Sequence, residues 1–225
     1  AEPERNAVEV VLSKNNHLGQ QPREQLKQLI DSVNFDQEFA KTLENSEVVL
    51  GFLFDDSAQN AGQIPNSVIN WSNDESQLSE IASFKHVLAN IPVLQSAATG
   101  AGFINSVPES DGFIRKASLV LNYQGKLYPS LALEAARVYT LADTIETKSK
   151  QSGGASWLQG LSFGSHFIPT NEKGQIFIPY KGRERSFKYV SATDVLNNRV
   201  EEDVLNGSVA FIGTSAVGLA DLRTT

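Results

Sequence analysis

The feature that most constrains the fold is a nearly continuous apolar run, 47-EVVLGFLF-54, which stops at Asp55 and Asp56. It has the length of a β-strand, and apolar residues on both faces are typical of a central strand in a parallel or mixed sheet. Close to the end of the sequence, Val209 to Ile212 form a second such run, and Gly213 marks a sharp turn after it. Two strands of this kind predict a sheet that is buried on both faces.

Helical patterns alternate with the strands. Leu26, Leu29, Ile30 and Val33 follow Pro22 at the spacing of one apolar helix face. Capping and periodic patterns predict four further helices. One begins at Asn34, with Phe35, Phe39 and Leu43 on one face, and a second covers 81–91, before Pro92. A third begins at Ser130, with Leu131, Ala135, Val138 and Tyr139 buried, and the fourth begins at 191-SATD-194.

Turn dipeptides divide the remaining strands. Asp111-Gly112 and Gln124-Gly125 separate strands within 101–130, and Lys173-Gly174 lies near a turn between two strands of 167–182. Polar segments predict loops over 55–76 and 150–156. The alternation predicts an α/β fold, a three-layer sandwich with a central mixed, mainly parallel sheet flanked by helices.

Composition limits the possible partners. The 225 residues fit one domain over 1–225, and a net charge of -7 argues against nucleic acid or an anionic membrane surface. No cysteine is present, which excludes disulfides, thiolate zinc sites and cysteine nucleophiles. No apolar run approaches the ~20 residues that span a bilayer. Because methionine is absent even from position 1, we expect the chain to come from a longer precursor.

Polar residues follow both apolar runs. If both runs are parallel strands, Asp55, Asp56, Thr214 and Ser215 come together at the carboxyl edge of the sheet, where α/β proteins bind ligands. The two carboxylates could hold a hard cation such as Mg²⁺. The alternative, which the turn-forming habit of aspartate favours, is that one caps the next segment and the other is solvated.

Catalytic patterns are weak. The segment 213-GTSAVG-218 matches neither a nucleophile elbow nor a phosphate-binding loop. A serine nucleophile would need a histidine base, and nothing places His17, His86 or His166 beside Ser215. No cluster has convincing metal-ligand spacing, so no cofactor is expected, and an α/β hydrolase-like enzyme is only a remote alternative.

Two other features have both a structural and a ligand-binding interpretation. Asp111, Gly112 and Arg115 could clamp an anion, but a tight turn with Gly112 at positive φ and Arg115 paired to a nearby carboxylate is favoured. Trp71 and Trp157 could line a ligand cleft, although aromatic residues more often simply pack.

Several stretches together resemble the CHASE2 domain family, extracytoplasmic sensory modules of bacterial transmembrane receptors. They occur in the family's order and cover most of the sequence from residue 36 onward. The stretches are 36-DQEFA-40, 48-VVLGFLF-54, 102-GFINSVPESDGFIRKASLVL-121, 128-YPSLALEAA-136, 178-IPYKG-182, 190-VSATDVL-196 and 209-VAFIGTSAVGLADLRTT-225.

The resemblance implies a place in a receptor. Such a domain lies on the periplasmic face of the cytoplasmic membrane, between transmembrane segments, and controls an output such as an adenylate or guanylate cyclase or a histidine kinase. Gly213 and Asp221 then belong to a core strand and its exit loop. The family's strand ahead of 1-AEPER-5 is lacking, so we expect an exposed sheet edge and self-association.

Three functions are therefore compared. A sensory input domain that binds an unknown small ligand and has no catalysis of its own is favoured. A structural dimerisation or spacer domain of the same receptor is the alternative, and an enzyme is the remote one. A convergent polar pocket would favour sensing, and a large self-complementary apolar face would favour assembly.

Overall fold

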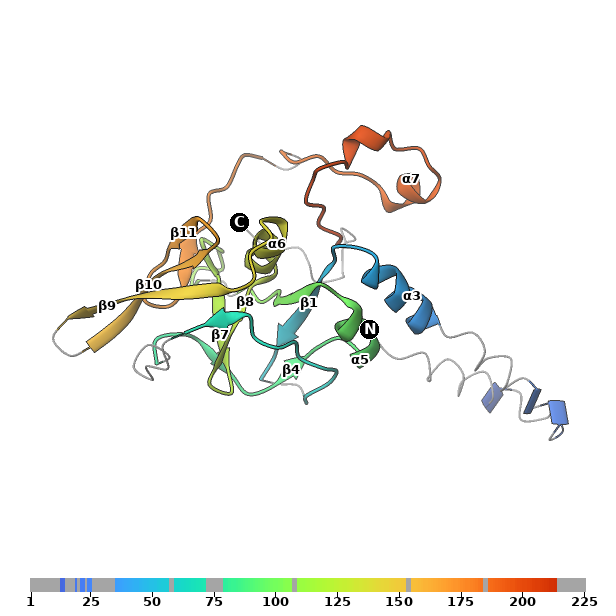
Figure 1. The fold of residues 1–225 in the computed structure, drawn as a ribbon, viewed down its shortest axis with the longest axis horizontal. Coiled ribbons are helices and arrows are strands. Elements are labelled where there is room, and N and C mark those ends of the chain that lie inside the picture. The colour runs from blue at the N-terminus through green and yellow to red at the C-terminus, as the bar shows by residue number, and fades with distance from the viewer. Residues whose placement is uncertain are drawn as a thin grey trace. The chain divides into compact units, whose positions relative to one another are not determined.

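A computed structural model describes residues 13, 14, 19, 21, 22, 24 and 25, and the ranges 35–56, 59–71, 79–106, 109–152, 155–183 and 186–213 (Figure 1). Their contacts divide the chain into two compact units. Unit 1 contains residues 1–105 and 118–174, and unit 2 contains 106–117 and 175–225. The mixed α/β class is confirmed. The three-layer arrangement and the single-domain organisation stay predictions, because the described strands form several small sheets.

The apolar run at 47–54 forms the expected strand in unit 1. Strand β1 (Val49–Phe54) pairs in parallel with β5 (Gly100–Phe103) and antiparallel with β4 (Val87–Leu88). The sheet order is β4-β1-β5, so β1 is its central strand. Phe52 and Phe54 are each only 2% exposed. The sequence prediction of a central strand in a mixed sheet is therefore confirmed.

A second sheet packs its aromatic residues against β1. It has the order β3-β7-β8, with β3 (Ser83–Phe84), β7 (Val120–Tyr123) and β8 (Lys126–Pro129). The ring of Phe54 stacks on Phe84 and Tyr123, with centroids 5.6 Å and 5.4 Å away, and meets Tyr128 edge-on at 5.9 Å. Burial raises the pKa of the Tyr128 phenol, which keeps this ring neutral. Phe54 thus joins the two sheets through one aromatic cluster.

The third sheet of unit 1 carries a long hairpin (Figure 1). Strands β9 (Ile145–Ser152) and β10 (Ala155–Phe163) pair antiparallel, β11 (His166–Pro169) extends one edge, and β2 (Ile69–Asn70) pairs in parallel with Ile145 and Glu146. Ile145 and Leu161 are fully buried. This short β2 pairing is what fixes the preceding loop against the body of the unit.

Helices α3 (Phe35–Glu44), α5 (Pro92–Ala97) and α6 (Leu131–Tyr139) cover parts of unit 1. Helix α3 packs on α5 through Ala40, Leu43 and Leu94. Helix α6 begins where the Ser130 hydroxyl accepts a hydrogen bond from the Leu133 amide, a standard N-cap. It lies against β5, and a Cβ at Gly102 would come within 2.6 Å of the Leu131 backbone. Gly102 therefore permits the close approach of helix and strand.

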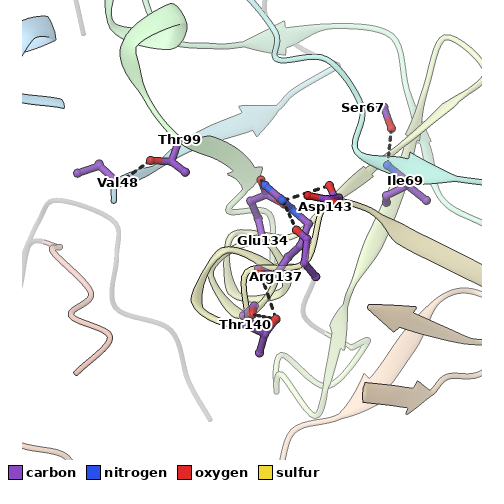
Figure 2. Close-up of polar contacts among 10 residues, drawn as sticks. Val48, Ser67, Ile69, Thr99, Glu134, Arg137, Thr140 and Asp143 are labelled. Atoms are coloured by element: carbon purple, nitrogen blue, oxygen red, sulfur yellow. Dashed lines mark hydrogen bonds and ion pairs between the residues drawn. The ribbon is translucent and has the colours of Figure 1, made fainter. Parts of the chain in front are cut away.

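Helix α6 buries an ion pair in addition to apolar residues (Figure 2). Glu134 is 1% exposed and accepts hydrogen bonds from Arg137 Nε (2.8 Å) and Nη2 (2.7 Å). Arg137 Nη1 also donates to the carbonyl oxygens of Ala142 (2.6 Å) and Asp143 (3.2 Å). The hydrogen bond to Glu134 is the largest cause of the raised pKa of Arg137, and the negative charges of Glu134 and Asp143 raise it further. Each buried charge therefore has several partners, as burial requires.

Unit 2 has few buried side chains. Strand β12 (Gln175–Phe177) pairs with β6 (Lys116–Ser118), and helices α7 (Ala192–Leu196) and η1 (Glu202–Val204) follow. Helix α7 begins at Ser191, whose hydroxyl accepts from the Thr193 amide, as 191-SATD-194 predicts. Among its described residues, Ile114 has a buried apolar side chain. Several large apolar side chains are exposed: Phe177, Tyr180, Phe187, Tyr189, Leu196, Phe211 and Ile212.

Three predicted elements are wrong. Residues 81–91 hold β3 and β4 instead of a helix, because pairing with β7 and β1 overrides local propensity. Residues 150–156 belong largely to β9 and β10, where Lys150 pairs with Trp157. Val209 to Ile212 lie outside any strand and are exposed, because no described strand pairs with them. An apolar run predicts burial but does not identify the partner.

Other predictions differ in detail. The predicted stripe over Leu26 to Val33 lies outside the described residues. In α3, Phe35 and Phe39 are exposed, and in α6 Tyr139 is 62% exposed while Glu134 and Arg137 are buried. The strands β11 and β12 pair with β10 and β6 instead of with each other. Among the described residues, no helix has both the length and the apolar composition needed to cross a membrane.

Phe54→Ala should destabilise the protein by about 3–5 kcal/mol, because it removes the ring on which both sheets pack. The matched control is Phe39→Ala, since Phe39 is 50% exposed on α3. Urea denaturation measures both free energies of unfolding. Equal losses in the two variants would show that Phe54 does not join the sheets.

Glu134→Gln should cost about 3 kcal/mol or more, because it leaves the buried Arg137 guanidinium without its carboxylate. Glu38 and Lys41 form an exposed ion pair with the same i, i+3 spacing, so Glu38→Gln is the control and should leave the melting temperature unchanged. A Glu134→Gln protein as stable as wild type would contradict the buried pair.

Candidate functional site

Asp55 and Asp56 lie where the sequence predicts, directly after β1. The Asp56 Oδ1 accepts a hydrogen bond from the Lys85 amide at 2.7 Å, so this carboxylate caps the segment that leads into β4. The Asp55 amide donates to the His86 carbonyl oxygen at 3.2 Å. Thr214, Ser215 and Asp221 lie outside the described residues, while Gly213 is described and exposed. A common crevice of Asp55, Asp56, Thr214 and Ser215 therefore stays a prediction.

Two asparagines that sequence reasoning missed hold this end of the sheet together. Asn105 pairs with both backbone groups of Phe54: its Oδ1 accepts from the amide (2.9 Å) and its Nδ2 donates to the carbonyl (2.7 Å). Asn60 Oδ1 accepts from the Val87 amide at 2.9 Å. Within the described part of the chain, no three His, Cys, Asp or Glu residues are grouped so that they could hold a metal ion. The polar side chains here mainly fasten backbone to backbone.

A pocket of about 510 Å³ lies elsewhere in unit 1, within the size range of small-molecule sites. Its walls come from two segments: the stretch that leads into and out of β2, and the β7–β8 turn with the start of β8. The lining residues are Asn66, Ser67, Ile69, Trp71, Gln124, Gly125, Lys126 and Leu127. Ile69 and Leu127 are buried and give the pocket an apolar base, whereas Lys126 and Asn66 are exposed at its rim.

The β2 wall is tied to β8 by one hydroxyl group. Ser67 Oγ donates to the Leu127 carbonyl oxygen at 2.5 Å and accepts from the Ile69 amide at 3.2 Å, which Figure 2 shows for Ser67 and Ile69. The Ile145 amide donates to the Val68 carbonyl at 2.9 Å. Backbone and side-chain bonds on both sides of Ser67 therefore hold this wall in place.

The opposite wall is a tight turn that the sequence predicts. Gln124 and Gly125 have φ values of 50° and 76°, and the two positive values are typical of a type I′ hairpin turn. Asn122 Oδ1 accepts from the Gly125 amide at 3.1 Å. Gln124 Nε2 donates to the Tyr123 hydroxyl at 3.1 Å. Because Tyr123 packs on Phe54, the turn is connected to the aromatic cluster.

Trp71 and Trp157 have different positions. Trp71 lines the pocket and is half-buried, in agreement with the ligand-cleft interpretation of this residue. Trp157 lies in β10 opposite Lys150 and does not line the pocket. No sequence pattern pointed to Asn66, Ser67 or Lys126. The two segments that carry them lie about sixty residues apart in the chain. They come together through the pairing of β2, a strand of two residues that is too short to predict.

The segment around Gly112 forms a tight turn in unit 2. Gly112 has a φ of 85°, and its amide donates to the Glu109 carbonyl at 2.8 Å. Arg115 Nη1 lies 2.8 Å from carboxylate oxygens of both Glu109 and Asp111. The pKa of Asp111 is lowered, first by the hydrogen bond from the Phe113 amide and then by that from Arg115. Both carboxylates that face Arg115 belong to the same segment. The geometry therefore agrees with a turn, in which the guanidinium forms ion pairs within the segment.

The comparison with known families decides the family. The family model of the CHASE2 domain matches residues 2–225. The chain belongs to the CHASE2 family. CHASE2 domains are extracellular sensory domains and are not catalytic, which agrees with an extracytoplasmic sensory role. Neither the curated proteins nor the solved structures contain a significant match to the chain.

Gly112→Val should destabilise the CHASE2 domain by about 1 kcal/mol or more, because a β-branched residue is strained at positive φ. A Cβ at Gly112 has nothing within 4 Å, so backbone strain alone would produce the loss. Gly213→Val is the control, since Gly213 is equally open and has no positive φ. An unchanged melting temperature for Gly112→Val in differential scanning calorimetry would contradict the turn.

Proposed function

We propose that the chain is the ligand-binding input domain of a bacterial transmembrane receptor. In this proposal it lies on the periplasmic face of the cytoplasmic membrane, adjoins transmembrane helices, and passes its signal to a cytoplasmic adenylate or guanylate cyclase or a kinase. The observation that carries the proposal is the match of the CHASE2 family model to residues 2–225. The three-layer arrangement of the family and its self-association belong to the same proposal.

The pocket of unit 1 supports ligand binding by this domain. It has the volume of a small-molecule site, an apolar base and several polar groups at its rim. Its walls are held by the Ser67 hydroxyl and by a type I′ turn, so it needs little rearrangement to accept a ligand. A preformed site with uncommitted polar groups is what a sensory domain requires. The edge at Asp55 and Asp56 is a second location to test.

A structural dimerisation domain is the alternative, and one observation favours it. The exposed apolar side chains of unit 2 include Phe177, Phe187, Tyr189 and Leu196, each at least 70% exposed. If these side chains form one continuous face, such a face would be covered in an assembly. Sedimentation over a concentration series distinguishes the two: dimerisation without any ligand-dependent stabilisation favours the structural role.

A thermal-shift screen of the domain against small metabolites and ions tests the proposed sensory function. A ligand that binds only the folded state adds about 2.7 kcal/mol to the free energy of unfolding at a hundredfold excess over its Kd, and so raises the melting temperature. We expect at least one compound to do so in a saturable way. A screen that covers anions, cations and neutral compounds without one saturable shift would contradict ligand sensing.

A further inference from the structure

The charges around the pocket select one class of ligand. Among the described residues that line it, Lys126 is the charged one and none carries a carboxylate. Within the described part of the chain, Lys126 forms no ion pair, as is also true of other exposed lysines such as Lys148 and Lys173. An ammonium group without a partner at the rim of a pocket attracts an anionic group.

A described carboxylate in the neighbouring strand pair is that of Glu146, which pairs with Asn70 across β2 and β9. Its Oε1 accepts hydrogen bonds from Asn70 Nδ2 at 2.8 Å and from Thr144 Oγ1 at 3.2 Å. Two donors thus hold this carboxylate, and neither Glu146 nor Asn70 lines the pocket. Among the described ion pairs, none joins Glu146 to Lys126.

Polar atoms make up most of the exposed lining of the pocket, and its smaller apolar part has room for a flat ring. Ile69 and Leu127, which are 6% and 2% exposed, and Trp71 are the apolar residues among those that line it. Aromatic side chains bind flat rings by offset or edge-on packing. The side chains of Trp71 and Asn66 make no hydrogen bond with another described residue, so their N–H groups are available for a ligand oxygen.

We infer that the pocket between Trp71 and Lys126 binds a small organic carboxylate with a flat, apolar body, such as a simple aromatic acid. Lys126 pairs with the carboxylate, Trp71 packs on the ring, and the amides of Asn66 and Gln124 surround the carboxylate end. The inference rests on the proposed function and adds to it the place and the chemical class of the ligand.

The two tryptophans make a local measurement possible. Trp157→Phe leaves Trp71 as the sole tryptophan of the chain, so its fluorescence reports on the pocket. In this background we titrate benzoate, acetate, inorganic phosphate, benzylamine and glucose. Benzoate should change the emission of Trp71 in a saturable way and bind about tenfold or more tightly than each of the other four, because it alone combines the ring with the anion.

Substitutions of two lysines separate the pocket from general electrostatics. Lys126→Met should weaken benzoate binding by about tenfold or more, because it removes the ammonium group and keeps an apolar side chain of similar length. Lys173→Met is the matched control, since Lys173 is also exposed in a hairpin turn and does not line the pocket; it should leave binding unchanged. Circular dichroism confirms that both variants are folded.

Three results would overturn the inference: no saturable change with benzoate, equal effects of the two lysine variants, or equally tight binding of benzylamine or glucose. These outcomes are distinguishable from failure of the proposed function. A different compound that stabilises the wild-type domain, with an affinity independent of Lys126, would retain the sensory role and reject this pocket.

Discussion

The packing of Phe54 is the interaction on which the rest of unit 1 depends. This ring ends the central strand β1 and lies between two sheets, one built around β1 and the other around β7. Tyr123, which stacks on Phe54, is also the last residue of β7 before the Gln124-Gly125 turn. The position of one pocket wall is therefore set by the same aromatic cluster that closes the core.

The other side of the scaffold depends on α6 and its buried charges. Glycines at 100 and 102 leave room for this helix against β5: a Cβ at Gly100 would collide with the Glu134 carboxylate, and one at Gly102 with the Leu131 backbone. Glu134 and Arg137 then satisfy one another, and Arg137 also binds the carbonyls at which the chain leaves the helix toward β9. Because β9 pairs with β2, the end of α6 also helps to position the second pocket wall.

Local signals in the sequence predicted local structure well. The strand at 47–54, the caps at Ser130 and Ser191, and the turn at Gln124-Gly125 each depend on neighbouring residues, and each is observed. Features that depend on distant partners were not predictable. Apolar periodicity favoured Tyr139 as a buried residue of α6, whereas the structure buries Glu134 and Arg137, whose pairing no apolar pattern reveals.

The candidate site shows the same division. Trp71 was one of two tryptophans considered for a cleft, and it lines the pocket, but the cation that defines the pocket was not singled out. No sequence pattern pointed to Lys126, because it lines a pocket only together with Ser67 and Ile69, about sixty residues earlier in the chain. Family membership gives the sensory role, and the geometry of two loops suggests where a ligand binds.

We propose that the domain senses a ligand at the pocket between residues 66–71 and 124–127. Amide hydrogen exchange of the whole domain, with and without saturating benzoate, tests it most directly, because bound ligand suppresses local opening. The account predicts slower exchange in these two segments and unchanged exchange in β11. Slower exchange confined to residues 53–56 and 104–106, at the carboxyl edge of β1 and β5, would contradict it, as would no change anywhere.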